Sequence, residues 1–207
     1  VTEQNKNQFK HGIFGLQVSA AAQGSGSAQQ MLTYNTSEDG LSLAKKVNKI
    51  QKYFIEETRL GIPIIPFDEA LHGLVRQGAT AFPQSIGLAA SFDTALVAKI
   101  GTAIANEARA RGLRDLLAPV INMATDVRWG RVEETYGEDP YLTTALGHAF
   151  MNAIERQNII VTPKHFIANV GDGGRDSYPI YFSERLLQEI HYPPFLEAFK
   201  KAGARSV

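Results

Sequence analysis

The sequence predicts an α/β fold in which parallel strands alternate with helices, as in a (β/α)8 barrel or a doubly wound sheet. Three observations lead to this prediction. Short apolar runs alternate with longer stretches in which apolar residues recur every three or four positions, as in an amphipathic helix. The run 116–121 contains almost no polar residue, which is typical of a strand buried on both faces. Polar residues follow these runs, as expected when loops at one edge of a parallel sheet build a site.

The expected strands are short and spread over the whole chain. They are residues 12–18, 62–67, 85–90, 116–121, 159–166 and a last strand that begins at 203. Pro63 and Pro66 make a central position with full ladder pairing less favourable for the second strand. A complete barrel needs eight strands over about 250 residues, so we expect a barrel formed by this chain to be incomplete.

The expected helices are residues 41–59, 91–112, 139–154 and 183–201. A serine or an aspartate stands at the N-cap of each of the last three. Pro140 suits the first helical position, whereas Pro193-Pro194 is expected to break the last helix. Residues 19–27, rich in Ala, Gly, Ser and Gln, are expected to form a flexible linker.

The composition is that of an ordinary globular protein and excludes several classes. At 207 residues with 44% hydrophobic residues, the chain is long enough to bury a sizeable core. The 21 basic residues balance 21 acidic ones, so the net charge gives no indication of binding to nucleic acid or to a membrane surface. A small neutral ligand fits this charge balance better. The absence of cysteine excludes disulfides and thiolate metal sites and leaves the compartment open. No apolar run approaches the roughly 20 residues of a membrane span.

The stretch 118–140 carries the strongest functional signal, because a strand runs there into a loop with the only tryptophan. Arg128 and Arg131 flank Trp129, an arrangement that suits a polyhydroxylated ring, bound by forked hydrogen bonds and by stacking. The alternative is an internal ion pair to one of the acidic residues at 133, 134, 138 and 139, and we expect this for one of the arginines. Arg131 is the expected ligand contact, and Arg128 is expected to brace the loop.

Carboxylates follow the second expected strand. For Asp68, a role as the N-cap of a helix is as plausible as a role in the functional site. For Glu69 we favour a functional role, as a carboxylate at the mouth of a pocket. His72 is expected to be a structural histidine bonded to the backbone, because no second histidine lies at ligand spacing. We therefore expect no metal.

Lys164 and His165 close the run 159–166, and a lysine that ends a buried strand rarely serves packing. Lys164 could donate to a substrate hydroxyl or, if desolvated, act as a Schiff-base nucleophile. The glycine-rich segment 171–174 lacks the spacing of a phosphate-binding loop, and a tight turn is the better interpretation.

Several motifs, in order, carry a resemblance to a known family. They are Glu69-Ala-Leu-His-Gly73, the run from Phe82 to Asp93, Arg128-Trp-Gly-Arg131 with Glu134-Thr-Tyr-Gly-Glu-Asp-Pro140, and Lys164-His-Phe166. From about residue 12 to residue 207 the chain resembles glycoside hydrolase family 3. The resemblance implies a TIM-type (β/α)8 N-terminal domain, incomplete here. It also implies retaining hydrolysis of β-glycosides from the non-reducing end through a covalent glycosyl-enzyme, with no cofactor.

The resemblance further implies that Glu69, Arg131, Lys164 and His165 bind the sugar in the subsite of cleavage. Typical glucosidases of the family have an aspartate where this chain has Glu69. A glutamate there is reminiscent of xylosidase-type members, whose sugar lacks a hydroxymethyl group. β-Glucosidase is the first expectation and β-xylosidase the alternative.

The resemblance places the catalytic nucleophile and the acid/base outside this chain, so residues 1–207 are expected to be a partial N-terminal barrel domain that is inactive alone. The expected partners are a β-linked oligosaccharide or aryl glucoside substrate, and further polypeptide or a second chain that completes the barrel. We expect no nucleic acid and no membrane as partners. The periplasm or the medium is favoured over the cytosol.

Two other hypotheses assign the chain to a different class of protein. One is a Schiff-base lyase that uses Lys164, which borohydride reduction with a carbonyl substrate would test by trapping an adduct. The other is a carbohydrate-binding barrel without catalysis, built on Trp129 and the two arginines. It requires a full-length protein that lacks both catalytic carboxylates and still binds sugar.

Overall fold

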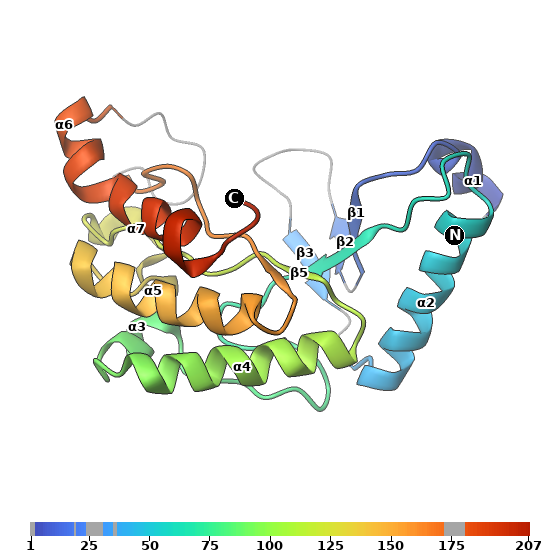
Figure 1. Cartoon of the computed structure of the whole chain (residues 1–207), viewed down its shortest axis with the longest axis horizontal. Helices are drawn as coiled ribbons and strands as arrows, with labels where there is room; N and C mark the ends of the chain where they lie inside the picture. The colour runs from blue at the N-terminus through green and yellow to red at the C-terminus, as the bar shows by residue number, and fades with distance from the viewer. Residues whose placement is uncertain (1–2, 19, 24–30, 35–36, 172–180) are drawn as a thin grey trace.

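The computed structural model describes residues 3–18, 20–23, 31–34, 37–171 and 181–207. In Figure 1 a sheet lies between helix α2 on one side and helices α4, α5 and α7 on the other. These helices span Gly40–Glu56 (α2), Thr94–Ala110 (α4), Pro140–Glu155 (α5) and Tyr192–Glu197 (α7). The arrangement is an α/β fold with a parallel sheet.

The parallel sheet has the order β1-β4-β5-β6. Its strands are Gly15–Gln17 (β1), Ile65–Asp68 (β4), Asp115–Leu116 (β5) and Ile160–Val161 (β6). All three neighbouring pairs are parallel, and Asp115 of β5 pairs with both Phe67 and Ile160. These strands confirm the expected strands at 12–18, 62–67, 116–121 and 159–166, although each is shorter than expected. The parallel pairing brings the carboxyl ends of β4, β5 and β6 to one edge of the sheet.

Two expected strands are wrong. Ser85–Ala89 is helix α3, and its buried residues Ser85, Leu88 and Ala89 have the i, i+3, i+4 spacing of one helical face. A run this short has too few positions for its period to separate a strand from a helix. Residues 203–207, where a last strand was expected to begin, form no strand, and Gly203 ends the preceding helical segment in the left-handed conformation with φ 85°.

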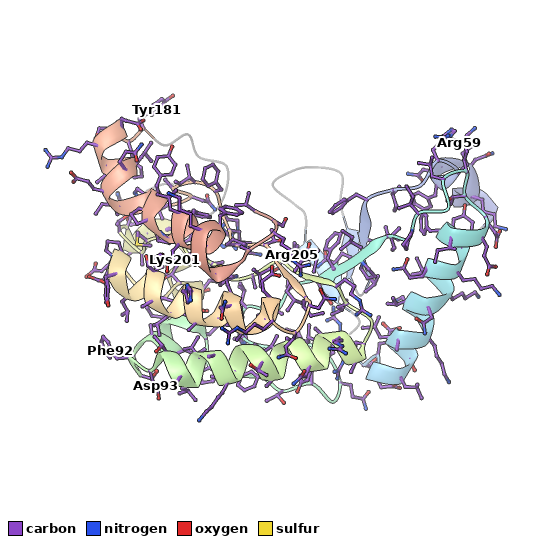
Figure 2. All side chains as sticks on the ribbon, viewed as in Figure 1. Arg59, Phe92, Asp93, Tyr181, Lys201 and Arg205 are labelled. Atoms are coloured by element: carbon purple, nitrogen blue, oxygen red, sulfur yellow. The ribbon has the colours of Figure 1, made fainter. Side chains whose placement is uncertain are left out.

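The three long helices α2, α4 and α5 confirm the helices expected from the sequence. Only the N-cap of α4 differs from the expected residue. Asp139 caps α5 by accepting a hydrogen bond from the backbone of Leu142, and Pro140 occupies the first turn. Helix α4 is capped by Asp93, which accepts from the backbone of Leu96, and not by Ser91. Figure 2 shows Asp93 at the N-terminal end of α4.

The last helical segment is continuous through the prolines that were expected to break it. Ser183 caps its start as expected. It comprises Glu184–Leu186 (α6), the π-helical turn Leu187–His191 (η3), α7 and a second π-helical turn, Ala198–Ala202 (η4). Pro193 and Pro194 directly follow the π-helical turn η3, where the regular i→i−4 bonding that a proline would break is already interrupted.

The remaining elements are short. Helix α1 spans Glu3–Phe9, and the 3-10 turns η1 and η2 span Val127–Trp129 and Val132–Glu134. Strands β2 (Ala20–Gln23) and β3 (Met31–Tyr34) form an antiparallel pair. The linker expected at 19–27 is therefore wrong for Ala20–Gln23, and its other positions lie outside the described residues.

The main core lies where α4 and α5 pack against the sheet. Leu116 and Val161 of the sheet, Ile104 of α4 and Phe150 of α5 are all fully buried in one cluster. Gly101 allows the two helices to approach closely, because a Cβ there would lie 3.0 Å from the backbone oxygen of Phe150. Of the described helices, none is both long and apolar enough to cross a membrane.

Candidate functional site

Two predicted site residues, 95 positions apart in the sequence, meet at the carboxyl edge of the sheet. Glu69 directly follows β4, and its carboxylate oxygens lie 2.7 and 2.9 Å from Nζ of Lys164. The side chains are 31% and 15% exposed, so the ion pair is only partly shielded. An ammonium and a carboxylate side by side offer both donors and acceptors to a neutral polar ligand.

The backbone beyond β5 holds Lys164 in place. Val120 forms a parallel bridge with Lys164. The backbone N–H of Ile121 donates to the Lys164 carbonyl, and the Lys164 N–H donates to the carbonyl of Pro119, each at 2.9 Å. The lysine thus belongs to an extension of the β5–β6 pairing, which fixes its backbone opposite Glu69.

A buried ion pair lies directly behind Glu69. Nη2 of Arg76 lies 2.6 Å from Oδ2 of Asp68, and the two side chains are 1% and 2% exposed. Oδ1 of Asp68 also accepts from the backbone N–H of Glu69 at 2.9 Å and from Gln17 Nε2 at 3.4 Å. Asp68 is thus a structural residue that ties the end of β4 to the following loop.

His165 is bound by a side chain that the sequence analysis did not single out. The carboxamide of Asn122 accepts from the His165 backbone N–H at 2.8 Å and donates to its carbonyl at 3.1 Å. Asn122 is 2% exposed. A lone polar residue inside the apolar run 119–124 was the only signal in the sequence for this role.

The two arginines of the 118–140 stretch each pair with a nearby carboxylate. Arg131 makes a forked contact with Glu134, with both N–O distances at 2.7 Å, and its side chain is 9% exposed. Arg128 is exposed and makes a forked contact with Asp126, upstream of the acidic residues expected as partners. Hydrogen bonds from Arg128 lower the pKa of the Asp126 carboxyl to about 2. Arg128 therefore braces the loop, as expected.

The prediction that the Trp129 ring stacks on a ligand is wrong, because the side chain is fully buried. It packs in a small cluster with Val120 and Val170. The Arg131 guanidinium lies 6.0 Å from the centre of the Trp129 ring. Trp129 thus anchors the loop to the sheet, and Gly130, with φ 81°, turns the chain between the tryptophan and Arg131.

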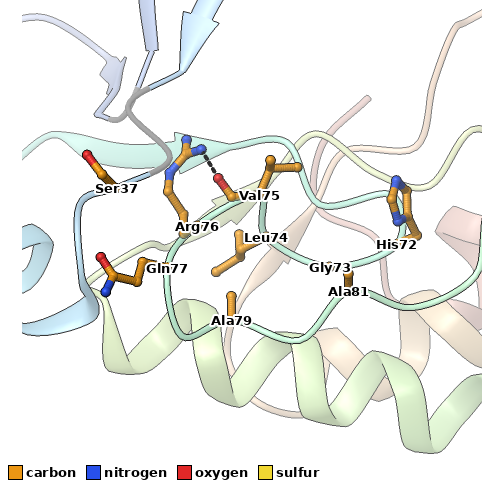
Figure 3. Close-up of a pocket in the computed structure, with 9 residues that line it drawn as sticks. All are labelled: Ser37, His72, Gly73, Leu74, Val75, Arg76, Gln77, Ala79 and Ala81. Carbon is orange, nitrogen blue, oxygen red and sulfur yellow. Dashed lines mark hydrogen bonds between the residues drawn. The ribbon is translucent and has the colours of Figure 1, made fainter.

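His72 has the structural role expected for it, because its Nδ1 lies 3.0 Å from the carbonyl oxygen of Phe82. It borders a cavity of about 550 Å³ beside the loop that follows Glu69 (Figure 3). Arg76 also borders this cavity, where its Nη1 donates to the Val75 carbonyl at 2.5 Å. The full lining is Ser37, His72, Gly73, Leu74, Val75, Arg76, Gln77, Ala79 and Ala81. Within the described part of the chain no cluster of three or more His, Asp or Glu could hold a metal ion.

Comparisons with known proteins agree on one family. The family model described as "Glycosyl hydrolase family 3 N terminal domain" matches residues 19–207. A β-xylosidase from Formosa agariphila is 35% identical, with 81% of this chain and 25% of that protein covered. A β-glucosidase from Rhizobium radiobacter is 37% identical, with 72% and 19% covered. Periplasmic β-glucosidases also match.

The fold is shared with solved structures as well. A β-glucosidase structure from Erythrobacter marinus superposes with a TM-score of 0.84 at 30% identity, over 99% of this chain and 27% of the other. The chain thus spans about a quarter of the length of the proteins it matches.

Proposed function

Because this chain belongs to glycosyl hydrolase family 3, we propose that it is part of a retaining β-glycosidase and supplies residues that hold the sugar in the subsite of cleavage. The sugar-binding residues are Glu69, Arg131, Lys164 and His165. The proposed activity is that of a β-glucosidase, which releases glucose from the non-reducing end of β-glucosides. The proposed substrates are β-linked oligosaccharides and aryl glucosides, and no cofactor takes part.

The observation that carries this proposal is the contact between Glu69 and Lys164. Sugar hydroxyls donate and accept hydrogen bonds at once, and a carboxylate beside an ammonium can satisfy both functions of one hydroxyl. The contact leaves the pair without excess charge, which suits a neutral sugar better than an anionic or cationic substrate. Arg131 adds a guanidinium whose plane is fixed by its two hydrogen bonds to Glu134.

The bond-breaking groups are proposed to lie outside residues 1–207. A retaining glycosidase needs two carboxyl groups about 5–5.5 Å apart across the scissile bond. Glu69 is engaged by Lys164 and Glu134 by Arg131, so both carboxylates already have binding or bracing roles. We therefore propose that residues 1–207 are a partial N-terminal barrel domain and that further polypeptide, or a second chain, completes the barrel. The isolated segment is expected to be inactive. For the compartment we propose the periplasm or the medium.

Glu69 supports a second candidate, a β-xylosidase. Its carboxylate is one methylene further from the backbone than that of an aspartate, so it reaches further into the pocket. Xylose lacks the hydroxymethyl group that glucose carries. A longer acidic side chain therefore suits the smaller sugar.

A comparison of two substrates tests the proposed function. We expect the intact enzyme to hydrolyse p-nitrophenyl β-glucoside with a higher kcat/KM than p-nitrophenyl β-xyloside. We expect Glu69→Asp to raise the glucoside-to-xyloside ratio by roughly 10-fold or more, because one methylene in a pocket changes discrimination by about 10- to 200-fold.

The control is Glu56→Asp, which shortens an exposed glutamate at the end of α2 and should leave the ratio unchanged. A wild-type preference for the xyloside would favour the xylosidase. Hydrolysis of neither glycoside would reject the proposed function.

A further inference from the structure

We propose that a cavity beside helix α5 is a second binding site, one that holds a neutral sugar without breaking a bond. The cavity has a volume of about 510 Å³, which is within the range of small-molecule sites. Residues of α4, α5, α7 and η4 line it. None of them belongs to the sugar-binding set proposed above.

Small side chains on one side of α5 leave room for the cavity. The opposite side of the helix carries large apolar residues such as Phe150, which is fully buried in the core. Ala145 and Ala149 line the cavity instead, together with Ala95 of α4. These methyl groups are too short to fill the space between the helices. They give the cavity an apolar floor.

An exposed aromatic ring adjoins this floor. Tyr141 lies in the first turn of α5 and is 83% exposed. It stands four positions before Ala145, so the two side chains share one face of the helix. A sugar ring presents C–H groups on one face, which pack well on an aromatic side chain that also has a polar end.

The last helical segment contributes a carboxylate and an ammonium. Oε2 of Glu197 lies 3.1 Å from Nζ of Lys201. Oε1 of Glu197 lies 3.2 Å from Nδ1 of His148 on α5, so the contact spans the two segments. Figure 2 shows Lys201 where this segment lies against α5.

The pair of Glu197 and Lys201 repeats the chemistry of Glu69 and Lys164. In both pairs, an ammonium beside a carboxylate offers donors and acceptors for the two functions of one hydroxyl. In both pairs each charge is offset by its partner, so the pair does not select a charged ligand. An apolar floor, an aromatic ring and such a pair together fit a ring with C–H groups on its face and hydroxyls at its edge. A glucose unit has this chemistry.

The test follows the floor of the cavity in the intact protein by NMR. Alanine methyl groups are labelled with 13C, and the signals of Ala145 and Ala149 are assigned by their loss in Ala145→Ser and Ala149→Ser. The probe is methyl 1-thio-β-glucoside, whose carbon–sulfur bond resists hydrolysis. We expect both signals to shift to saturation with one dissociation constant. Inorganic phosphate, added in a separate titration, is expected to leave them unchanged.

Two substitutions and their matched controls identify the contacts. We expect Tyr141→Ala to weaken binding by roughly 10-fold, because an aromatic contact is lost, and Tyr141→Phe to retain it. We expect Lys201→Met to weaken binding by roughly 2- to 12-fold, the range for one hydrogen bond. Tyr181→Ala and Lys200→Met remove an exposed tyrosine and an adjacent lysine that do not line the cavity. These controls should change the affinity by less than about 2-fold.

Alanine signals that do not move with the thioglucoside would overturn the inference, as would equal weakening by Tyr141→Ala and Tyr181→Ala. Signals that respond to phosphate and not to the thioglucoside would show an anion site and contradict the ligand class. Lys164→Met should leave the shift of Ala145 unchanged, because Lys164 does not line the cavity. Loss of the shift in that variant would show that the signal reports binding at the proposed sugar site. Absence of hydrolysis by the intact enzyme would reject the proposed function and leave this test unaffected.

Discussion

Replacing Arg76 by methionine is expected to lower the free energy of unfolding by about 3–5 kcal/mol. The variant removes the guanidinium that lies 2.6 Å from Asp68 and leaves that carboxylate buried. The backbone N–H of Glu69 at 2.9 Å and Gln17 Nε2 at 3.4 Å also donate to it, but neither carries a charge. A carboxylate without a cation in a buried place is strongly unfavourable. The measurement is urea unfolding followed by circular dichroism.

Arg128→Met is the matched control, because Arg128 also pairs with an aspartate at 2.6 Å but has a side chain that is 63% exposed. The expected loss of stability there is much smaller, because ion pairs between exposed side chains contribute little. The double variant Asp68→Leu/Arg76→Met should lose less than Arg76→Met alone, because it removes the stranded carboxylate as well. Equal losses in the two single arginine variants would contradict the role given to the buried pair.

Lys164→Met is expected to lower kcat/KM for p-nitrophenyl β-glucoside by roughly 10- to 150-fold in the intact enzyme. Hydrogen bonds to charged groups contribute about 1.5–3 kcal/mol each, and each 1.36 kcal/mol is a factor of ten in rate. Methionine keeps an unbranched apolar side chain as far as Cε but removes the ammonium that contacts Glu69 at 2.7 Å. Kinetic assays with matched enzyme concentrations measure the effect.

The control for this variant is Lys46→Met, which removes another lysine paired with a glutamate, Glu38, at 3.2 Å. Lys46 lies on helix α2, so its loss should leave kcat/KM unchanged. A Lys164→Met enzyme with normal kcat/KM would show that Lys164 does not contact the substrate. Adduct formation on Lys164 with a carbonyl substrate and borohydride would instead favour the Schiff-base hypothesis.

The sequence predicts the long helices and the central strands well because their signals are local. Two adjacent residues, Asp139 and Pro140, mark the start of α5 in the sequence. Apolar residues at helical spacing then indicate the rest of the helix. The failures have physical reasons too. Residues 85–90 are too few to show a period, and Pro193 is tolerated inside a continuous helical segment because it directly follows the π-helical turn η3.

The candidate site could be predicted where its residues follow strands directly. Parallel strands bring their carboxyl ends to one edge, so Glu69 and Lys164 meet although 95 positions separate them. Residues that act through distant contacts could not be found in this way. Asn122 and His165 are 43 positions apart, and nothing local to Asn122 indicates its partner. The burial of Trp129 is not predictable from its local sequence for the same reason, because it depends on contacts with Val120 and Val170.

The central claim is that this chain holds the sugar while carboxylates outside residues 1–207 break the glycosidic bond. The most direct test is to treat the intact enzyme with a 2-deoxy-2-fluoro-β-glucoside that has a good leaving group. The fluorine slows hydrolysis of the covalent glycosyl-enzyme, so the labelled peptide can be identified by mass spectrometry. We expect a single label on a carboxylate outside residues 1–207. A label on Glu69, Glu134 or any other carboxylate of this chain would contradict the claim.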